Sequence, residues 1–435
     1  MEDKLEHILT LVGEYIKEKN AAKTWVKGRD IVFYAAPYFD EKEIIEASKT
    51  LFKGWLGLSQ HGKLFERNFS KEFQRKYGVM TNSGSSANLL MASAMASKNG
   101  LKLPAKSKVI VPVAGFPTTL NPILQSGFTP VFVDIDIQSL CPLIEQIEEV
   151  AKDAKAIMFA HPLGNCPDMD KLMEIVKQRS LILLEDCCDA LGSNYDGKPL
   201  GSFGLMSSCS FYPAHHMTMG EGGFVATDDK NLEKVLRSLR DWGRSCYCNG
   251  EASHKCPDGL CGQRFSKWIP SLPNDVFDHK YIYDEIGYNL KPIELQASLG
   301  IHQIGKLSEM KAARVRNHQA LFKVFEPYQD FFTLPKATEK CDPSWFSFAL
   351  TLKPNCPFKK SDICQFLENN KIQTRPFFGG NLLLQPAYNH LADGLLYPNS
   401  TYVMLNTFFI GVAPNITQEQ VDYIEEIFQS FIKKY

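Results

Sequence analysis

The fold class of this chain is decided by residues 156–190, AIMFAHPLGNCPDMDKLMEIVKQRSLILLEDCCDA. Two short apolar runs, AIMFAHP (156–162) and LILLEDCCDA (181–190), enclose an amphipathic helical stretch, and turn residues follow each run. Apolar runs of this length between turn signals are typical of buried strands. The segment therefore predicts a strand, a helix and a second strand.

The same alternation of apolar runs and helical patterns extends from about residue 77 to residue 228. It includes two further predicted strands, KVIVPV (108–113) and TPVFVDI (129–135). Such a pattern is typical of an α/β fold with a mostly parallel sheet flanked by helices, in which ligands bind beyond the carboxyl ends of the strands. We expect the functional site at that edge of the sheet.

The rest of the chain predicts the domain organisation. Residues 244–282 interrupt the alternation with Cys, Gly, Pro and Asp, which indicates an ordered insertion with its own support. A predicted helix from 292 to 323 then leads to a smaller C-terminal α+β domain. We therefore expect a large domain over 1–325, which includes an N-terminal helical segment and the insertion, and a small domain over 326–435.

Composition and charge favour an enzyme that acts on a small molecule. The 435 residues carry 48 Lys and Arg against 49 Asp and Glu, so no basic field attracts nucleic acid or an anionic membrane. No apolar run reaches the roughly 18 residues of a membrane span. The acidic, helix-patterned start MEDKLEHILTLVGEYIKEKN also lacks the features of a secretory signal. We expect a cytoplasmic protein that binds neither nucleic acid nor membrane.

A phosphate site is predicted by TNSGSSANLLMASAMA (81–96). Gly84, Ser85 and Ser86 precede a strong helical pattern, where free backbone N–H groups and the helix dipole attract an anion. An ordinary helix cap explains the same residues equally well.

Two further motifs follow in the same region. Asp186 ends a predicted strand, where a carboxylate can pair with the protonated pyridine nitrogen of a cofactor, although a helix-capping aspartate is an alternative. SFYPAHHMTMGEGG (210–223) then offers the Ser210 hydroxyl and several glycines that permit a close approach of the backbone.

Together with GFPTT (115–119) and GYNL (287–290), these motifs resemble the DegT/DnrJ/EryC/StrS family of sugar-nucleotide aminotransferases, which are fold-type I pyridoxal-phosphate enzymes. The resemblance extends from about residue 37 to residue 385. It implies the fold-type I architecture, and it implies that Gly84, Ser85, Asp186 and Ser210 bind the cofactor.

His215 departs from the pattern of the family. At this position, five residues after Ser210, the family has the lysine that holds the cofactor covalently, and an imidazole cannot form that bond. The resemblance therefore implies non-covalent pyridoxamine 5'-phosphate, with His215 as a base that is effective near neutral pH. The alternatives are a protein inactivated by loss of its lysine and an aminotransferase in which Lys198 reaches the cofactor.

Histidine at this position is similar to the sugar 3-dehydrases of the family. One kind acts on a CDP-linked sugar and carries an iron–sulfur cluster, and another acts on a GDP-linked sugar without one. Cys246, Cys248 and Cys256 form C-x-C-x7-C after the distant Cys188, and this arrangement is similar to the cluster motif of the first kind, which implies a 2Fe-2S cluster. A zinc site and unliganded thiols are alternatives, and Cys187 or Cys261 could replace a ligand.

The resemblance assigns four more positions. Phe116 would stack on the pyridine ring, and Asp189 would lie near the ring hydroxyl. Asn289 would reach the cofactor phosphate of the neighbouring subunit, which implies a homodimer. Arg375, in TRPFFGGNLLLQP (374–386), can offer a bidentate contact to the substrate. The alternatives are core packing for Phe116, a capping or surface carboxylate for Asp189, a turn-forming asparagine for Asn289 and a surface arginine for Arg375.

The resemblance implies removal of the 3-hydroxyl from a nucleotide-linked 4-keto-6-deoxyhexose, with a flavin- or iron–sulfur-containing reductase as electron donor. A GDP-sugar dehydratase, which needs no cluster, is the second candidate. A non-catalytic protein that uses the fold as a binding scaffold is the third. The iron content of the purified protein distinguishes the first candidate from the second.

Overall fold

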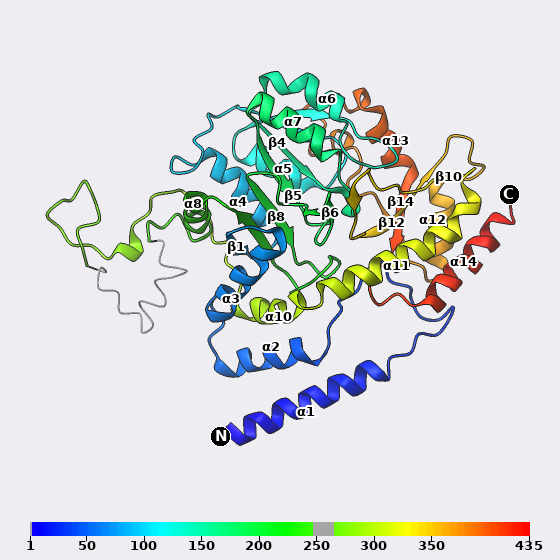
Figure 1. The fold of residues 1–435 in the computed structure, drawn as a ribbon, viewed down its shortest axis with the longest axis horizontal. Helices are drawn as coiled ribbons and strands as arrows, with labels where there is room; N and C mark the ends of the chain where they lie inside the picture. Colours follow the sequence, from blue (N-terminus) through cyan, green and yellow to red (C-terminus); the bar gives the residue numbers. More distant parts are fainter. Residues whose placement is uncertain (1, 247–264) are drawn as a thin grey trace.

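The computed structural model describes residues 2–246 and 265–435, and Figure 1 shows their arrangement. Seven strands form the central sheet in the order β1-β9-β8-β5-β4-β2-β3, and only β9 runs antiparallel to its neighbours. These strands are β1 Tyr77–Thr81, β2 Lys108–Pro112, β3 Thr129–Val133, β4 Ala156–Ala160, β5 Ile182–Asp186, β8 Met206–Ser210 and β9 Gly223–Thr227. The four strands predicted from the sequence are present, and the mostly parallel sheet is confirmed.

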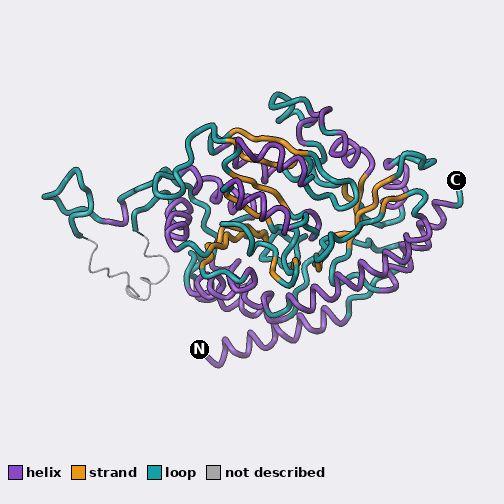
Figure 2. Tube along the Cα trace, turned by 45° about the horizontal axis from the view of Figure 1, so that its top comes forward, coloured by secondary structure: helices purple, strands orange, loops and turns teal. Residues whose placement is uncertain are grey.

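Helices cover both faces of this sheet (Figure 2). One face carries α4 Gly84–Ala96, α5 Pro117–Gln125 and α8 Lys230–Arg240; the other carries α3 Gln60–Phe69, α6 Ile144–Val150, α7 Met169–Arg179 and α10 Glu294–Ile304. Alternate residues of a strand enter the two cores, so that Leu183 of β5 packs in one and Leu184 in the other. Because both faces are buried, the strands appear in the sequence as continuous apolar runs.

A second core lies towards the C-terminus. Four antiparallel strands in the order β10-β12-β14-β13 pack against helices α12 and α14. The elements are β10 Phe332–Thr333, β12 Ser347–Leu352, α12 Lys360–Asn369, β13 Arg375–Pro376, α13 Pro398–Asn406, β14 Thr407–Gly411 and α14 Gln418–Ile432. A three-stranded sheet of β11 Cys341–Asp342, β6 Asn194–Tyr195 and β7 Lys198–Pro199 joins the two parts of the chain.

The long helix α11 Leu307–Phe325 connects the two cores, because Met310 packs in the first and Phe325 in the second. From the N-terminal part of the chain, Val32 also packs in the second core and pairs with Ile372. The division of the chain into domains at residue 325 stays a prediction.

The single helix predicted over 292–323 is wrong, because α10 ends at Ile304 and α11 begins at Leu307. Gly305 favours a helix end, since glycine has the lowest helix propensity apart from proline. At the break, the Lys306 ammonium forms ion pairs with Asp40 at 2.8 Å and Glu43 at 2.6 Å.

The N-terminal segment is helical, as predicted: α1 Glu2–Ala21 lies along the outside of the molecule and contacts α2 Glu41–Lys53 (Figure 1). Residues 265–282 of the predicted insertion project from the body beside α8 (Figure 1). Residues 247–264 of the insertion lie outside the described part of the chain. Among the described helices, none is both long and apolar enough to cross a membrane.

A buried ionic network holds α8 and α3 around the edge strand β1. Glu66 of α3 forms ion pairs with Arg237 at 2.9 Å and Arg240 at 3.1 Å, both from α8. Glu66 also accepts a hydrogen bond from the backbone amide of Met80 in β1 (2.9 Å). One carboxylate is therefore shared by two buried guanidinium groups, each of which also pairs with a second carboxylate, Glu233 or Asp241.

We predict that Glu66→Gln lowers the free energy of unfolding by about 1.5–3 kcal/mol, because it removes the charged partner that the two buried guanidinium groups share and leaves each with a single carboxylate, Glu233 for Arg237 and Asp241 for Arg240. Urea unfolding followed by circular dichroism would measure the change. Glu233→Gln is the control, since Glu233 pairs with the same Arg237 from a more exposed position and should cost about 1 kcal/mol or less. Equal losses in the two variants would contradict the importance of the shared carboxylate.

Candidate functional site

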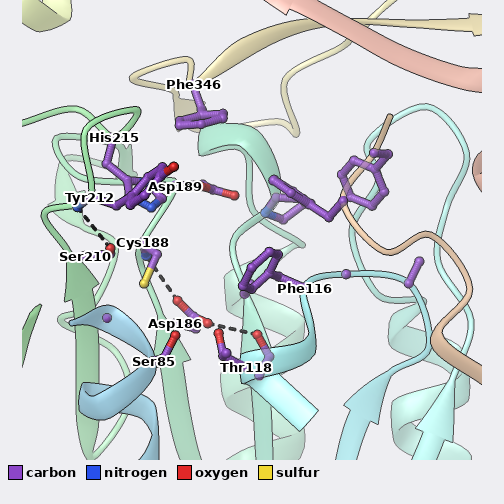
Figure 3. A pocket seen from close by; sticks show the side chains of 18 of the residues that line it. Ser85, Phe116, Thr118, Asp186, Cys188, Asp189, Ser210, Tyr212, His215 and Phe346 are labelled. Atoms are coloured by element: carbon purple, nitrogen blue, oxygen red, sulfur yellow. Dashed lines mark hydrogen bonds and ion pairs between the residues drawn. The ribbon is translucent and has the colours of Figure 1, made fainter. Parts of the chain in front are cut away.

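A cavity of about 530 Å³ lies at the carboxyl ends of β5 and β8, beside the first turn of α4 (Figure 3). Residues of the C-terminal part of the chain, among them Phe346 and Phe409, complete its wall. The cavity brings together nine of the predicted site residues: Gly84, Ser85, Phe116, Asp186, Cys188, Asp189, Ser210, His215 and Arg375. The functional site therefore lies at the predicted edge of the sheet.

The first turn of α4 forms one end of the cavity. Ser83 caps this helix by accepting a hydrogen bond from the Ser86 amide (3.1 Å), and this cap leaves Gly84 and Ser85 in the cavity wall, where an anion site stays a prediction. A β-carbon at Gly84 would lie 2.4 Å from the β-carbon of Ser210 and 3.1 Å from the sulfur of Cys188. Only glycine allows the helix this close to β8, and the free N–H groups of its first turn then face the cavity.

Asp186 forms the floor of the cavity, and its carboxylate is held from three directions. Asn88 Nδ2 donates to Oδ2 at 2.7 Å, Thr119 Oγ1 donates to the same oxygen at 2.9 Å, and the Cys188 amide donates to Oδ1 at 3.1 Å. Asp186 does not cap a described helix, which removes the alternative interpretation. A carboxylate fixed in this way fits the protonated nitrogen of a pyridine ring.

Sequence reasoning missed Asn88 and Thr119 as partners of Asp186. A signal for Asn88 was present: it directly precedes the apolar run LLMASAMA (89–96) in the same predicted helix. A buried side-chain amide in such a helix requires a hydrogen-bond partner. Thr119 lies in the quoted motif GFPTT, in which only Phe116 was singled out.

His215 lies in the cavity wall beside Asp189. Its Nδ1 is 3.4 Å from Asp189 Oδ1, which is within ion-pair range and long for a hydrogen bond. Burial raises the pKa of Asp189 above its ordinary value, and the imidazole of His215 opposes this effect. The ring of Phe346 packs against His215 with 5.5 Å between centroids. With Nδ1 directed at Asp189, Nε2 is the atom that can take up a proton.

His216 has a different environment. It is buried, does not line the cavity, and its Nε2 lies 2.5 Å from the backbone oxygen of Ser344. Burial lowers the pKa of His216 well below its ordinary value, so the ring is neutral near neutral pH. Of the two adjacent histidines, only His215 therefore lines the cavity.

Aromatic side chains line the cavity both opposite His215 and beside it. Phe116 is 51% exposed, which excludes core packing as its role, and its ring contacts Phe378 edge to face. Tyr212, another cavity residue that sequence reasoning missed, also contacts His215 edge to face (Figure 3). These faces can hold a flat heteroaromatic ring.

Arg375 is the only arginine among the described residues that line the cavity, and no lysine of residues 2–246 or 265–435 lines it. The guanidinium lies over the Tyr34 ring at 4.5 Å and 3.9 Å from Glu368. Lys198, the alternative anchor for a cofactor, lies in β7 and does not line the cavity. The described residues thus suit a cofactor that is held without a covalent bond.

Of the two adjacent cysteines after β5, only Cys188 faces the cavity. Burial and the neighbouring Asp186 raise the pKa of its thiol well above the ordinary value. Cys187 packs on the other side of the sheet beside His161 and Glu185, so its substitution for Cys188 as a ligand is not supported.

The other predicted cluster ligands are not in the cavity wall. Cys246 is partly buried and does not line the cavity. Cys248 and Cys256, with the alternative ligand Cys261, lie outside the described residues.

Asn289 does not line the cavity of its own chain. It is exposed, pairs with Asp241 in an isolated bridge and accepts a hydrogen bond from Lys291 (2.8 Å). Its predicted contact with the cofactor of a neighbouring subunit stays a prediction.

Comparison with known proteins identifies related sequences over nearly the whole chain. The profile of the DegT/DnrJ/EryC1/StrS aminotransferase family matches residues 37–429. Lipopolysaccharide biosynthesis protein RfbH of Salmonella typhimurium is 40% identical over 433 residues, which are 98% of this chain and 97% of that protein. The dTDP-4-dehydro-2,6-dideoxy-D-glucose 3-dehydratase of Saccharopolyspora spinosa is 38% identical over 439 residues, 99% of this chain and 93% of that protein.

Solved structures show the same fold. The E. coli GDP-4-keto-6-deoxy-D-mannose-3-dehydratase with bound hydrated PLP has a TM-score of 0.80 and 28% identity, and the match covers 92% of this chain and 100% of that one. The fold class predicted from the sequence, that of the pyridoxal-phosphate-dependent sugar aminotransferases, is confirmed.

We predict that Gly84→Ala weakens the binding of pyridoxamine phosphate about tenfold or more, or roughly 1.4 kcal/mol, because the added carbon displaces the first turn of α4 from β8. Fluorescence titration of the cofactor-free protein would measure the affinity. Gly305→Ala is the control, since a β-carbon there would meet its nearest neighbour, the backbone oxygen of His302, at the ordinary contact distance of 3.8 Å. Unchanged affinity in Gly84→Ala would remove the helix N-terminus from the site.

Proposed function

Because the chain belongs to the DegT/DnrJ/EryC1/StrS aminotransferase family, we propose that it is a pyridoxamine-phosphate-dependent dehydrase that removes the 3-hydroxyl of a nucleotide-linked 4-keto-6-deoxyhexose. One observation carries the proposal: His215 lies beside Asp189 in a cavity whose described wall contains no lysine. A transaminase of this family needs that lysine, whereas a dehydrase needs a base that stays free. The 3-dehydratases among the relatives support the same reaction class.

The described residues fit the cofactor. The first turn of α4, with Gly84 and Ser85, and the Ser210 hydroxyl would hold its phosphate. Phe116 would cover the ring, and Asp186 would pair with the ring nitrogen. When bound, pyridoxamine phosphate supplies an amine for the 4-keto carbon and a ring that accepts electron density.

His215 supplies the proton transfer. Asp189 orients the imidazole through Nδ1 and stabilises its protonated form, so Nε2 can take up a proton and then donate it to the departing 3-hydroxyl, which leaves as water. Phe346 packs against the ring and limits the access of bulk water to it. Arg375 would bind the phosphates of the nucleotide.

A specific substrate is part of the proposal: CDP-4-keto-6-deoxy-D-glucose, as a step in 3,6-dideoxysugar biosynthesis. The cysteine pattern supports this choice over the GDP-linked sugar, since it is similar to the pattern of the cluster-containing CDP-sugar enzyme. The second candidate is a GDP-4-keto-6-deoxy-D-mannose 3-dehydratase, favoured by the relatives of that name at 29% and 30% identity.

A 2Fe-2S cluster held by Cys188, Cys246, Cys248 and Cys256 completes the proposal, with a flavin- or iron–sulfur-containing reductase as the source of electrons. Its support is the place of Cys188, which faces the cavity two residues after Asp186. A cluster on that thiolate would deliver single electrons close to the cofactor ring. Binding of iron would also deprotonate a thiol whose pKa is raised in the free protein.

We also propose a homodimer. Trp55 is 70% exposed, and Leu56 beside it accepts a hydrogen bond from the amide of Glu294, so Trp55 and the exposed Ile293 share one region of the surface. Ile286, only three residues before Asn289, is 99% exposed. Exposed apolar side chains of this kind favour burial against a second copy, and the exposed Asn289 would then be expected to reach the neighbouring cavity.

We predict that His215→Asn lowers turnover by about 10²- to 10⁴-fold, since asparagine can keep a donor towards Asp189 but provides no base in place of Nε2. Mass spectrometry of products would measure this with a panel of CDP-, GDP-, UDP- and dTDP-linked 4-keto-6-deoxy sugars and a reductant. The parent protein should form a 3-deoxy product from the CDP-linked sugar.

The control for His215→Asn is His216→Gln, in which the amide can replace Nε2 as a donor to Ser344 and turnover should be largely retained. A loss confined to the His216 variant would place the base at the neighbouring residue. Formation of an amino sugar by the parent protein would overturn the dehydrase proposal.

We predict that Cys248→Ser loses its iron and forms no 3-deoxy product with a reductase, but still exchanges the methylene proton of the cofactor with solvent when substrate is present. Elimination needs a base and the cofactor, whereas reduction needs single electrons. Iron analysis and mass spectrometry would measure both effects, with Cys364→Ser in α12 as the control. Full product formation by iron-free Cys248→Ser would show that the cysteines serve another purpose.

A further inference from the structure

Arg314 is a buried guanidinium that contacts the backbone of the active histidine. It lies on α11, the helix that connects the two cores, and is 2% exposed. Its Nη2 donates to the backbone oxygen of His215 at 3.4 Å. Its Nη1 donates to the backbone oxygens of Trp345 at 3.3 Å and Phe346 at 3.1 Å. One side chain thus joins the segment that carries the base to the segment that carries the ring packed against it.

The charge of Arg314 is compensated incompletely. In the described part of the chain, no carboxylate lies within 4.0 Å of its guanidinium, and its Nε has no hydrogen-bond partner. Burial lowers the pKa of Arg314 to about 10, and the charge of Asp189 opposes the shift. A buried charge without a direct ionic partner costs free energy that an apolar side chain of similar volume would avoid. Filling space therefore does not account for an arginine at this position.

The segment that Arg314 binds is fixed to the large core at further points. The Phe346 amide donates to Leu163 at 2.9 Å, and the Ser344 amide donates to the Ser193 hydroxyl at 2.8 Å. His216 contacts the Ser344 oxygen. Because residues 344–346 make this many contacts, the Phe346 ring has little freedom to move. Arg314 therefore links His215 to a fixed part of the protein.

We propose that Arg314 is a positioning residue for His215: it fixes the backbone of the histidine relative to residues 345–346, so that the imidazole stays between Asp189 and Phe346. Arg314 does not line the cavity, so we expect it to affect the reaction through the position of His215. The proposal rests on the proposed function insofar as His215 is the base. The position of the ring is a property of the protein that can be measured without turnover.

The first test compares Arg314→Met and Arg314→Lys. Both should lower kcat by about tenfold or more, with KM and the affinity for pyridoxamine phosphate changed little, and lysine should restore part of the loss because its ammonium can still donate to one or two carbonyl oxygens. Arg314→Lys keeps the test decisive if the methionine variant does not fold. A parallel fall in cofactor affinity, or an unchanged kcat, would overturn the proposal.

Combination with His215→Asn separates positioning from general structural damage. If Arg314 acts through His215, Arg314→Lys should reduce the residual turnover of His215→Asn no further. An equal loss in both backgrounds would overturn the proposal. His318→Phe is the matched control, because His318 lies one turn along α11 and stacks on Trp345 at 4.1 Å without a hydrogen bond to the histidine segment in the described structure.

The second test does not depend on activity. NMR spectra of protein labelled with 13C in the histidine rings would be recorded with bound pyridoxamine phosphate, and the His215 signal identified by its absence in His215→Asn. Arg314→Lys should shift or broaden this signal, while His318→Phe leaves it in place. An unmoved His215 signal in Arg314→Lys would overturn the proposal. If the parent protein performs no dehydration but the signal moves, the proposed function fails and the positioning role stands.

Discussion

The close contact between the first turn of α4 and the carboxyl ends of β5 and β8 is the constraint on which the site depends. Because residue 84 is a glycine, the helix can approach Ser210 and Cys188 so closely that an added β-carbon would lie 2.4 Å from the Ser210 β-carbon and 3.1 Å from the Cys188 sulfur. The same approach places Asn88, one turn further along the helix, within 2.7 Å of Asp186. The anion site and the orientation of the floor carboxylate therefore have one common cause.

The two-residue period of β5 separates the chemistry of neighbouring side chains. Leu184, Asp186 and Cys188 face the side of the sheet that carries α4, whereas Leu183, Glu185 and Cys187 face the other. On that other side, burial opposes ionisation of Glu185, but hydrogen bonds from His161 and from backbone amides outweigh it and lower the pKa of the carboxyl. Strand β5 thus presents the Asp186 carboxylate to the cavity and the Glu185 carboxylate to a buried pair with His161.

Charge in the cavity is distributed unevenly. Three carboxylates line the described wall, those of Asp186, Asp189 and Glu221. The wall contains one arginine, Arg375. An anionic nucleotide sugar must therefore obtain much of its stabilisation from the helix N–H groups at the first turn of α4. This arrangement also explains why the cavity can hold a base: without a lysine, the imidazole of His215 has no competing amine beside it in the described wall.

The sequence by itself determined the four central strands, the mostly parallel sheet, the edge at which the site lies and nine residues of its wall, because strand burial and helix starts are local patterns. It also identified His215 as the departure from the family pattern. The motif positions favoured His215 over His216 and Cys188 over Cys187, but which member of each pair faces the cavity depends on the backbone direction at the end of a strand, which the structure supplies. Only the tertiary structure brought Asn88, Thr119, Phe346 and Arg314 to the site, because their contacts join segments between about 30 and 130 residues apart, and no local pattern records such distances.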